Sequence, residues 1–212
     1  MAVYAAIYKE IIMANPNTKK YWDEKAKKYS DKNNPENPLC HPIKDEIWEI
    51  MRHLDYQDQV LDIGAGSGRI IKRIATLRPN LNYSVCDLSS KSVEFLRETQ
   101  KFSESFICDI NNRIQKAPKS FDVVIATEVL EHVDNPKLLL QEMARLARKK
   151  IIISTPYKDR IKSTEHVREF DLNQIYEMMS EYGMVYLTVA CGNSNIVAAC
   201  YLSDRKGKNE NS

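Results

Sequence analysis

The chain has 212 residues, a net charge of +2 and a hydrophobic fraction of 43%. This length and composition are typical of a globular domain with a single core. The net charge is too small to indicate a nucleic-acid-binding surface. The sequence contains no run of 18 apolar residues, so we expect no membrane span. The five cysteines include no CxxC pair, so we expect free thiols in a reducing cytoplasm and neither disulfides nor a zinc site.

The N-terminal region predicts helices and a loop but no strand. Helical spacing of apolar residues occurs over residues 3–13, 18–29 and 43–54, and a proline- and asparagine-rich loop covers 30–42. Lys9 and Glu10 interrupt the apolar start, which favours an amphipathic helix over a secretion signal. We assign residues 1–57 to a helical lid, in which Tyr21, Trp22 and Tyr29 are expected to serve as packing residues.

From residue 59 onward, short β-rich runs alternate with longer amphipathic runs. This alternation predicts an α/β fold with a doubly wound, mostly parallel sheet. The expected strands are residues 59–63, 82–86, 104–108, 121–126 and 150–154, and the expected helices between them are 68–77, 89–99 and 136–147. The basic residues near the end of the last helix are expected to be solvated there; they are Arg145, Arg148, Lys149 and Lys150.

The C-terminal part departs from this alternation. A helix is predicted over residues 172–182, with Gly183 as the glycine that ends it, and two runs at 184–190 and 196–201 predict an antiparallel hairpin. We assign residues 58–203 to the main domain. The all-polar or glycine residues 204–212 are expected to be a disordered tail.

Half of the six glycines fall within five residues, directly after the first predicted strand. Gly64, Gly66 and Gly68 follow Asp62 in the run DIGAGSGR. The dinucleotide fingerprint GxGxxG requires a glycine where this chain has Arg69. A diphosphate would be repelled by Asp62, whereas a sulfonium with an amino-acid tail would be attracted because its ammonium group suits a carboxylate.

Acidic residues also follow the second and third predicted strands. Asp87, followed by Leu88, is placed to accept hydrogen bonds from two ribose hydroxyls. Asp109 is placed to accept from an adenine amino group, with Ile110 against the ring. Each acid alone would be an ordinary turn residue, but three at consecutive strand ends after a glycine loop indicate a nucleoside ligand.

These residues closely resemble the class I S-adenosylmethionine-dependent methyltransferases, in their type-11 branch. The resemblance covers roughly residues 58–183, and the hairpin fits the seventh strand of that family; Ser67 stands where several members have cysteine. It implies a seven-stranded Rossmann-like sheet with S-adenosyl-L-methionine over the point where the strand order reverses. The cofactor-binding residues it implies are Asp62, Gly64, Ala65, Gly66, Gly68, Asp87, Leu88, Asp109, Ile110 and Glu128.

The segment TEVLEHV after the fourth strand resembles a segment of the same family that lies along the methyl-donor side of the pocket. Glu128, Glu131 and His132 are spaced to share one face of a helical turn. His166, in a segment HVREF that resembles the family's acceptor loop, is expected to lie near them. We assign His132 and His166 as candidate catalytic residues and assign no metal ligand; alternatively, each histidine serves packing only.

Three functions remain open at this point. The first is a methyltransferase that acts on oxygen, nitrogen or carbon of a small-molecule acceptor. The second is a divalent-metal-assisted RNA 2′-O-methyltransferase, because small-RNA methyltransferases have a similar Glu-x-x-Glu-His segment and a later histidine. The third is a non-catalytic nucleotide-binding module, which Arg69 disfavours. Membrane and nucleic-acid partners are not expected, and the sequence identifies neither the acceptor nor the oligomeric state.

Overall fold

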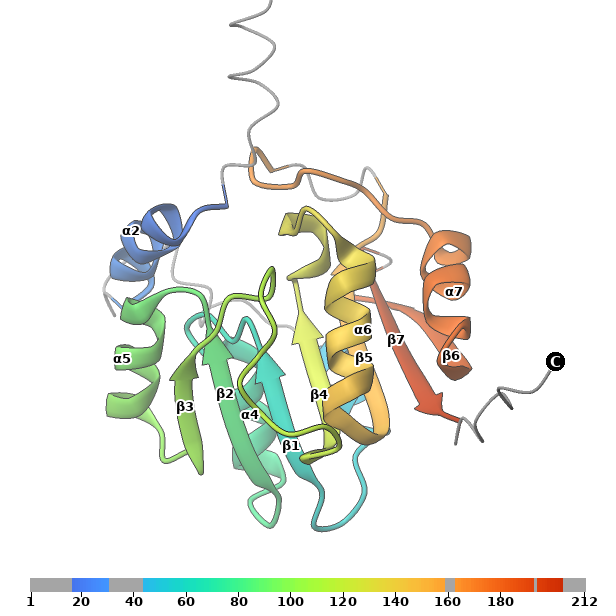
Figure 1. The fold of residues 1–212 in the computed structure, drawn as a ribbon, viewed down its shortest axis with the longest axis horizontal. Coiled ribbons are helices and arrows are strands. Elements are labelled where there is room, and N and C mark those ends of the chain that lie inside the picture. The colour runs from blue at the N-terminus through green and yellow to red at the C-terminus, as the bar shows by residue number, and fades with distance from the viewer. Residues whose placement is uncertain (1–16, 31–43, 159–162, 193, 204–212) are drawn as a thin grey trace, which may run out of the picture.

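The computed structural model of the protein describes residues 17–30, 44–158, 163–192 and 194–203 (Figure 1). The predicted helix at 3–13, most of the loop at 30–42 and the tail at 204–212 lie outside these residues. The described elements, in chain order, are α2 (Lys19–Ser30), α3 (Lys44–Met51), β1 (Gln59–Ile63), α4 (Arg69–Leu77), β2 (Asn82–Asp87), α5 (Ser90–Thr99), β3 (Glu104–Ile107), β4 (Phe121–Thr127), the short 3-10 helix η2 (Leu130–His132), α6 (Pro136–Leu146), β5 (Ala147–Pro156), α7 (Leu172–Ser180), β6 (Gly183–Ala190) and β7 (Asn195–Leu202).

The seven strands form one sheet in the order β3-β2-β1-β4-β5-β7-β6. The first five pair in parallel, whereas β7 pairs antiparallel with both β5 and β6. The predicted doubly wound, mostly parallel sheet with a terminal hairpin is therefore confirmed. The order reverses between β1 and β4, where such sheets form a crevice at the carboxyl ends of their strands.

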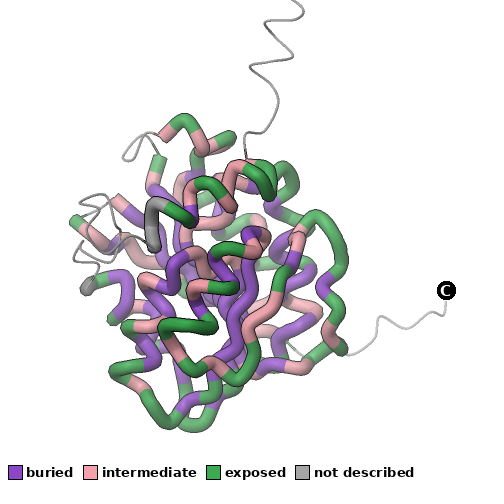
Figure 2. Tube along the Cα trace, turned by 90° about the vertical axis from the view of Figure 1, so that its left-hand side faces the viewer, coloured by how far each residue is buried: buried purple, intermediate pink, exposed green. Residues whose placement is uncertain are grey.

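Helices cover both faces of the sheet. One core cluster joins the sheet to α6 and α7, and the other joins it to α3, α4 and α5. Alternate residues of strand β5 pack into the two clusters, because successive side chains of a strand point to opposite faces of the sheet. Ile151 and Ile153 belong to the first cluster and Ile152 belongs to the second. The buried strands between exposed helical surfaces are visible in Figure 2.

Polar side chains fix where the helices begin. Ser89 accepts a hydrogen bond from the backbone N–H of Ser92 at the start of α5, and Asn135 accepts from Leu138 at the start of α6. Asp171 and Gln174 form a reciprocal capping box at the start of α7. Each cap satisfies backbone donors that the first helical turn leaves without partners.

The structure corrects the role predicted for Gly183. Helix α7 ends at Ser180, its C-cap residue is Glu181, and Gly183 is the first residue of β6. A Cβ atom at Gly183 would lie 2.0 Å from the carbonyl oxygen of Tyr201. The glycine is therefore required by the close approach of the two hairpin strands, not by a left-handed helix end.

The prediction of a solvated basic helix end is also wrong. Helix α6 ends at Leu146, so Arg148, Lys149 and Lys150 belong to strand β5. Lys150 is buried and donates to Asp55 at 2.6 Å, which holds the segment before β1 against the sheet. These side chains form ion pairs because β5 runs beside strands that have acidic residues at or just before their first residue.

None of the described helices combines the length and apolar character that crossing a membrane would require. Cys86, Cys108, Cys191 and Cys200 are free thiols, as the sequence predicts for these four cysteines. Cys86 and Cys108 lie beside each other at the ends of β2 and β3, with their sulfur atoms 2.7 Å apart.

Candidate functional site

A cavity of about 540 Å³ opens at the carboxyl ends of the parallel strands, and residues of α2 line part of it. Its position matches the reversal of strand order between β1 and β4. Nine of the ten residues predicted to bind the cofactor line it; they are Asp62, Gly64, Ala65, Gly66, Asp87, Leu88, Asp109, Ile110 and Glu128. The tenth, Gly68, does not line the cavity and instead serves as the N-cap residue of α4.

Each glycine of the loop has a left-handed backbone conformation. The φ angles are 72° at Gly64, 55° at Gly66 and 76° at Gly68. An added Cβ would lie 2.5 Å from Val129 at Gly64 and 2.6 Å from Leu96 at Gly68, but would meet no atom within 4 Å at Gly66. The outer glycines are therefore needed for packing, whereas the space beside Gly66 is part of the cavity.

Asp87 fixes the loop and faces the cavity at the same time. One of its carboxylate oxygens accepts from the backbone N–H of Gly66 at 2.7 Å, and the other accepts from Ser89 at 2.8 Å. Burial raises its pKa, and these two hydrogen bonds oppose the increase. Each carboxylate oxygen has a second lone pair, so the same side chain is able to accept from a bound diol.

Asp109 and Asp62 contrast in their hydrogen bonding. Asp109 accepts from the backbone of Asn111 and the amide of Asn112, both at 2.9 Å, so it stabilises the turn after β3. Asp62 is buried, and its Oδ1 has no hydrogen-bond partner among the described residues. Burial raises the pKa of Asp62 well above its usual range, and the nearby carboxylates of Asp87 and Glu46 raise it further.

The segment after β4 does not form the predicted helical face. Glu128 has a φ of 55° and precedes the three-residue helix η2, so the three residues do not lie on one regular α-helical turn. Its Oε1 accepts from the amide of Asn195 at 2.8 Å. A left-handed glutamate is uncommon, and such residues are found where a site fixes the backbone.

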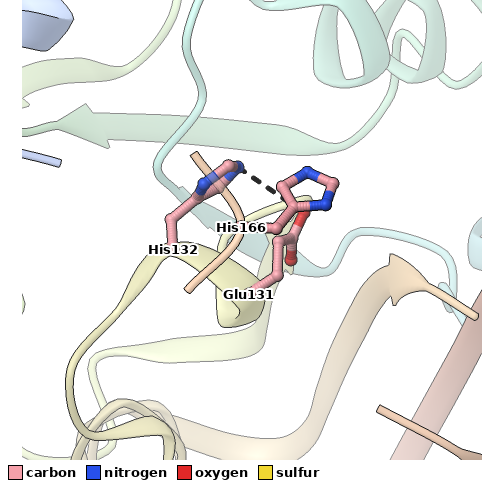
Figure 3. A group of neighbouring side chains, drawn as sticks. All are labelled: Glu131, His132 and His166. Carbon is pink, nitrogen blue, oxygen red and sulfur yellow. Dashed lines mark ion pairs between the residues drawn. The ribbon is translucent and has the colours of Figure 1, made fainter. Parts of the chain in front are cut away.

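Three of the four residues expected to converge do so. The rings of His132 and His166 lie 5.1 Å apart, and Nε2 of His132 lies 3.6 Å from Oε1 of Glu131 (Figure 3). One ligand-type atom from each of the three residues lies within 4.8 Å of the others. Only His132 of this triad lines the cavity, while His166 supports it from the loop after β5.

The surroundings of His132 determine its tautomer. Its Nδ1 lies 3.0 Å from the carbonyl oxygen of Glu165, and a carbonyl only accepts, so Nδ1 carries the proton and Nε2 has the lone pair. Burial lowers the pKa of His132 to about 4, although the Glu165 carbonyl opposes this. Burial also raises the pKa of Glu131 to about 8, against a hydrogen bond from Thr155. Burial therefore favours the neutral imidazole of His132 and opposes ionisation of Glu131.

Helix α2 covers the cavity and holds the loop that carries His166. Tyr21 and Lys25 both donate to the carboxylate of Glu165, and the ring of Trp22 packs edge-on against His132 at 5.1 Å. Trp22 and Lys25 also line the cavity. The role of Tyr21 and Trp22 as packing residues of the lid stays a prediction, and the residues they contact, Glu165 and His132, belong to the site.

The same part of α2 is also attached to the cofactor side, through Asp23. Asp23 accepts from the hydroxyl of Ser89 at 2.7 Å and from the backbone N–H of Lys91 at 3.3 Å, at the start of α5. Burial alone would raise the pKa of Asp23, but its hydrogen bonds from Lys19, Ser89 and Lys91 outweigh burial and lower the pKa to about 2. The helix thus bridges the two sides of the cavity.

Sequence reasoning missed four residues of this region. Glu46 lies on α3 and Lys25 on α2, both outside the motifs, and Glu165 directly precedes the HVREF segment in the loop after β5. Arg69 was noted only as a departure from a fingerprint, yet it lines the cavity. A charged side chain in a short helix has no local pattern that distinguishes it from a solvated one, so only the tertiary structure identifies it.

Together these side chains define a cavity with two chemically different ends. One end has backbone donors and the acids of β2 and β3, which suit a nucleoside. The other has buried carboxylates, a guanidinium and the neutral histidine, which suit charged groups and a proton transfer.

The comparisons with known proteins agree with this geometry. Residues 61–150 match a family model described as "Methyltransferase domain". The chain is 30% identical over 109 residues to the yeast (Saccharomyces cerevisiae) protein "Ubiquinone biosynthesis O-methyltransferase, mitochondrial", and 29% identical over 109 residues to "Malonyl-[acyl-carrier protein] O-methyltransferase" of Neorickettsia risticii. These matches cover 49% and 51% of this chain but only 35% and 42% of the relatives.

A solved structure shows the same fold. The S-adenosylmethionine-dependent methyltransferase of Aquifex aeolicus superposes with a TM-score of 0.64 at 14% identity, over 85% of this chain and 98% of that one. At this identity the likeness concerns the fold alone. Residues 61–150 of this chain are thus similar in sequence to a methyltransferase domain, and the chain shares the fold of an S-adenosylmethionine-dependent methyltransferase.

Proposed function

We propose that the protein transfers a methyl group from S-adenosyl-L-methionine to an oxygen atom of a small-molecule acceptor. The nucleoside would lie over the glycine loop, with Asp87 accepting from the ribose and Asp109 and Ile110 at the adenine. Asp62 and Glu128 would face the other end of the cofactor. In this proposal α2 is the part of residues 1–57 that acts as the lid over residues 58–203.

The observation that carries the proposal is the tautomer of His132. Its Nε2 lone pair belongs to a neutral imidazole in the cavity wall, because Nδ1 donates to the Glu165 carbonyl. S-adenosylmethionine supplies an electrophilic methyl group, so the chain has to supply alignment and a base for a hydroxyl acceptor. An amine acceptor would need less help from a base. Both curated relatives are named as O-methyltransferases, which supports an oxygen acceptor.

The test is a screen of metabolite extracts with methyl-labelled cofactor, followed by variants on the acceptor found. His132→Gln should lower kcat by about 10²-fold or more, as loss of a general base does. His53→Gln is the matched control, since His53 is a buried histidine that contacts Tyr201 of β7 and does not line the cavity. Both variants should bind S-adenosylhomocysteine within twofold of the wild type. Equal losses of kcat in the two variants would remove His132 from the chemistry.

A second candidate function is favoured by the Glu131, His132 and His166 cluster, whose ligand-type atoms are close enough to hold a divalent cation. A metal-assisted RNA 2′-O-methyltransferase would use such a cation. Glu128 does not join the cluster, because its carboxylate is directed toward Asn195 and Ser154. The set is therefore three of the four ligands that this function predicts.

Metal removal distinguishes the two functions. If the protein methylates a small molecule without a metal, EDTA leaves the methylation rate unchanged. If the protein is a metal-assisted RNA methyltransferase, methylation of a short RNA disappears with EDTA and returns with Mn²⁺. Binding of S-adenosylhomocysteine but not NAD, measured by calorimetry, would separate both enzymatic functions from a dinucleotide-binding module.

A further inference from the structure

Two thiols meet where β2 and β3 end, on one face of the sheet. Cys86 pairs with Phe106 in the register of these parallel strands, and Cys108 follows Phe106 by two residues. Because side chains two residues apart along a strand point the same way, both thiols lie in the core cluster that joins the sheet to α6 and α7. The register of β2 and β3 therefore brings the two cysteines together, although 21 residues separate them in the chain.

The distance between the sulfur atoms of this pair suits a disulfide better than a shared metal ion. The two atoms are 2.7 Å apart, and both cysteines are free thiols in the structure. A disulfide has its sulfur atoms about 2.05 Å apart, so only a small displacement separates the two states. A metal ion held by two thiolates at about 2.3 Å would instead place the sulfur atoms about 3.8 Å apart. The geometry therefore favours oxidation of the pair over ligation.

Only one of the two thiols is open to a reagent. Cys108 is 7% exposed and lines the cavity, whereas Cys86 is 0% exposed and does not line it. Burial raises the pKa of the Cys86 thiol well above its usual range, and the adjoining Cys108, Asp87 and Asp62 raise it further. The thiolate is the nucleophilic form of cysteine, so Cys86 is a poor first nucleophile. A reaction of this pair would therefore begin at Cys108, from the cavity.

We propose that Cys86 and Cys108 are a modification site, which a peroxide entering through the empty cavity oxidises to a disulfide and which a ligand in the cavity protects. Cys108 directly precedes Asp109 and Ile110, the residues proposed to lie at the adenine. A bound nucleoside would therefore cover the route to Cys108. The protection by ligand rests on the proposed function, whereas the oxidation of the empty protein does not.

The oxidation proceeds in two balanced steps. The Cys108 thiolate attacks one oxygen of hydrogen peroxide, so an S–O bond forms, the O–O bond breaks, and the departing hydroxide takes the thiol proton to become water. The Cys86 sulfur then attacks the sulfenic sulfur of Cys108. The S–S bond forms, the S–O bond breaks, and hydroxide leaves as a second water with the Cys86 proton. The two thiols lose two electrons, and the peroxide gains them.

Peroxide treatment of the reduced chain, followed by alkylation and digestion without reduction, tests the pairing. Trypsin cleaves between the two cysteines at Lys91, Arg97 and Lys101, so a disulfide appears by mass spectrometry as two linked peptides that dithiothreitol separates. Cys86→Ser should stop the reaction at a sulfenic acid on Cys108, which dimedone labels. Cys108→Ser should leave Cys86 reduced.

Protection is measured by the rate at which the linked peptides form. With S-adenosylhomocysteine at about 100 times its Kd, about 1% of the cavities are empty, so the rate should fall roughly tenfold or more. Cys200→Ser is the matched control, since Cys200 is as buried as Cys86 and does not line the cavity. This variant should form the linked peptides at the rate of the wild type, with and without ligand.

The outcomes separate the pairing from the protection. Folded, unliganded wild type that yields no linked peptides would overturn the modification site. Linked peptides that form equally fast with bound ligand would overturn the role of the cavity as the route of the peroxide. Thermal unfolding shows whether each variant is folded. If calorimetry shows no binding of S-adenosylhomocysteine, the proposed function fails, and oxidation of the unliganded protein still decides whether the two thiols pair.

Discussion

At the residue scale, the backbone of the glycine loop combines packing and recognition. A side chain at Gly64 or Gly68 would collide with Val129 or Leu96. Gly66 has the same left-handed backbone but faces open space in the cavity wall. Packing therefore requires glycine at positions 64 and 68, whereas the glycine at position 66 leaves space in the cavity for a ligand.

This separation gives a prediction for Gly66. Gly66→Ala should lower the free energy of unfolding by about 1–2 kcal/mol, since a left-handed alanine is strained. It should also weaken S-adenosylhomocysteine binding at least tenfold, because the methyl group would enter the space of the ligand. Gly192→Ala is the control: φ at Gly192 is 65°, its Cβ would also meet nothing within 4 Å, and it does not line the cavity. Calorimetry that shows equal affinity losses in the two variants would refute the placement of Gly66.

The sequence predicts some site residues much better than others. Asp62 and Asp87 are predictable because each lies at the carboxyl end of an apolar strand, and such ends meet at one edge of the sheet. Glu46 and Glu165 are not, since they reach the site only through the packing of α3 and the connection of α2 to a distant loop. Glu128 was predicted at the right edge of the sheet, but its left-handed backbone and its hydrogen bond from Asn195 leave no signal in the sequence.

At the element scale, one acidic residue joins the starts of three strands. Asp122 on β4 accepts from the backbone N–H of Gln59 on β1 and from the guanidinium of Arg148 on β5, both at 3.0 Å. Lys149 lies 3.3 Å from the same carboxylate. Burial alone would raise the pKa of Asp122, but the bonds from Arg148, Gln59 and Lys149 outweigh it and lower the pKa to about 2.

The lowered pKa predicts how Asp122 contributes to stability at different pH values. A carboxyl whose folded pKa lies below its unfolded value of about 3.9 contributes stability above that value and loses it as the pH falls through about 2. Asp122→Asn should lower the free energy of unfolding by about 1 kcal/mol at pH 7, with a deficit that narrows below about pH 4. Urea unfolding from pH 7 to pH 3 measures this. A deficit independent of pH, or one matched by Asp45→Asn at an exposed site, would contradict it.

The elements themselves follow largely from local patterns. Apolar runs predict the central parallel strands β1, β4 and β5 because a doubly covered strand must be apolar on both sides, whereas β3 at the sheet edge is half polar. The start of β5 was misplaced by three residues, since its first part, Ala147 to Lys149, carries exposed basic side chains that form ion pairs with Asp122 and Asp58. Tertiary ion pairs of this kind leave no periodic signal in the sequence.

At the scale of the whole molecule, the two edges of the sheet differ. The carboxyl edge carries the cavity, α2 and the loop with Glu165, and in Figure 1 the parallel strands point toward it. The opposite edge carries short connections such as residues 78–81 and 116–120. Helix α2 bridges the two sides of the cavity edge through Asp23 and Tyr21. A ligand in the cavity would therefore stabilise segments that are far apart in the chain but close in space.

This asymmetry predicts where a ligand orders the protein. S-adenosylhomocysteine at about 100 times its Kd should raise the free energy of unfolding by about 2.7 kcal/mol, and the Tm by roughly 5–10 °C. Hydrogen exchange with mass spectrometry should show slower exchange in residues 19–30, 64–68 and 87–92, because these segments surround the cavity. Residues 78–81 and 116–120 are the internal control, and their exchange should change little. Hydrogen exchange that slows equally at both edges would indicate a general stabilisation without the predicted site. Ligand binding that leaves the exchange of α2 unchanged would show that this helix is not a lid.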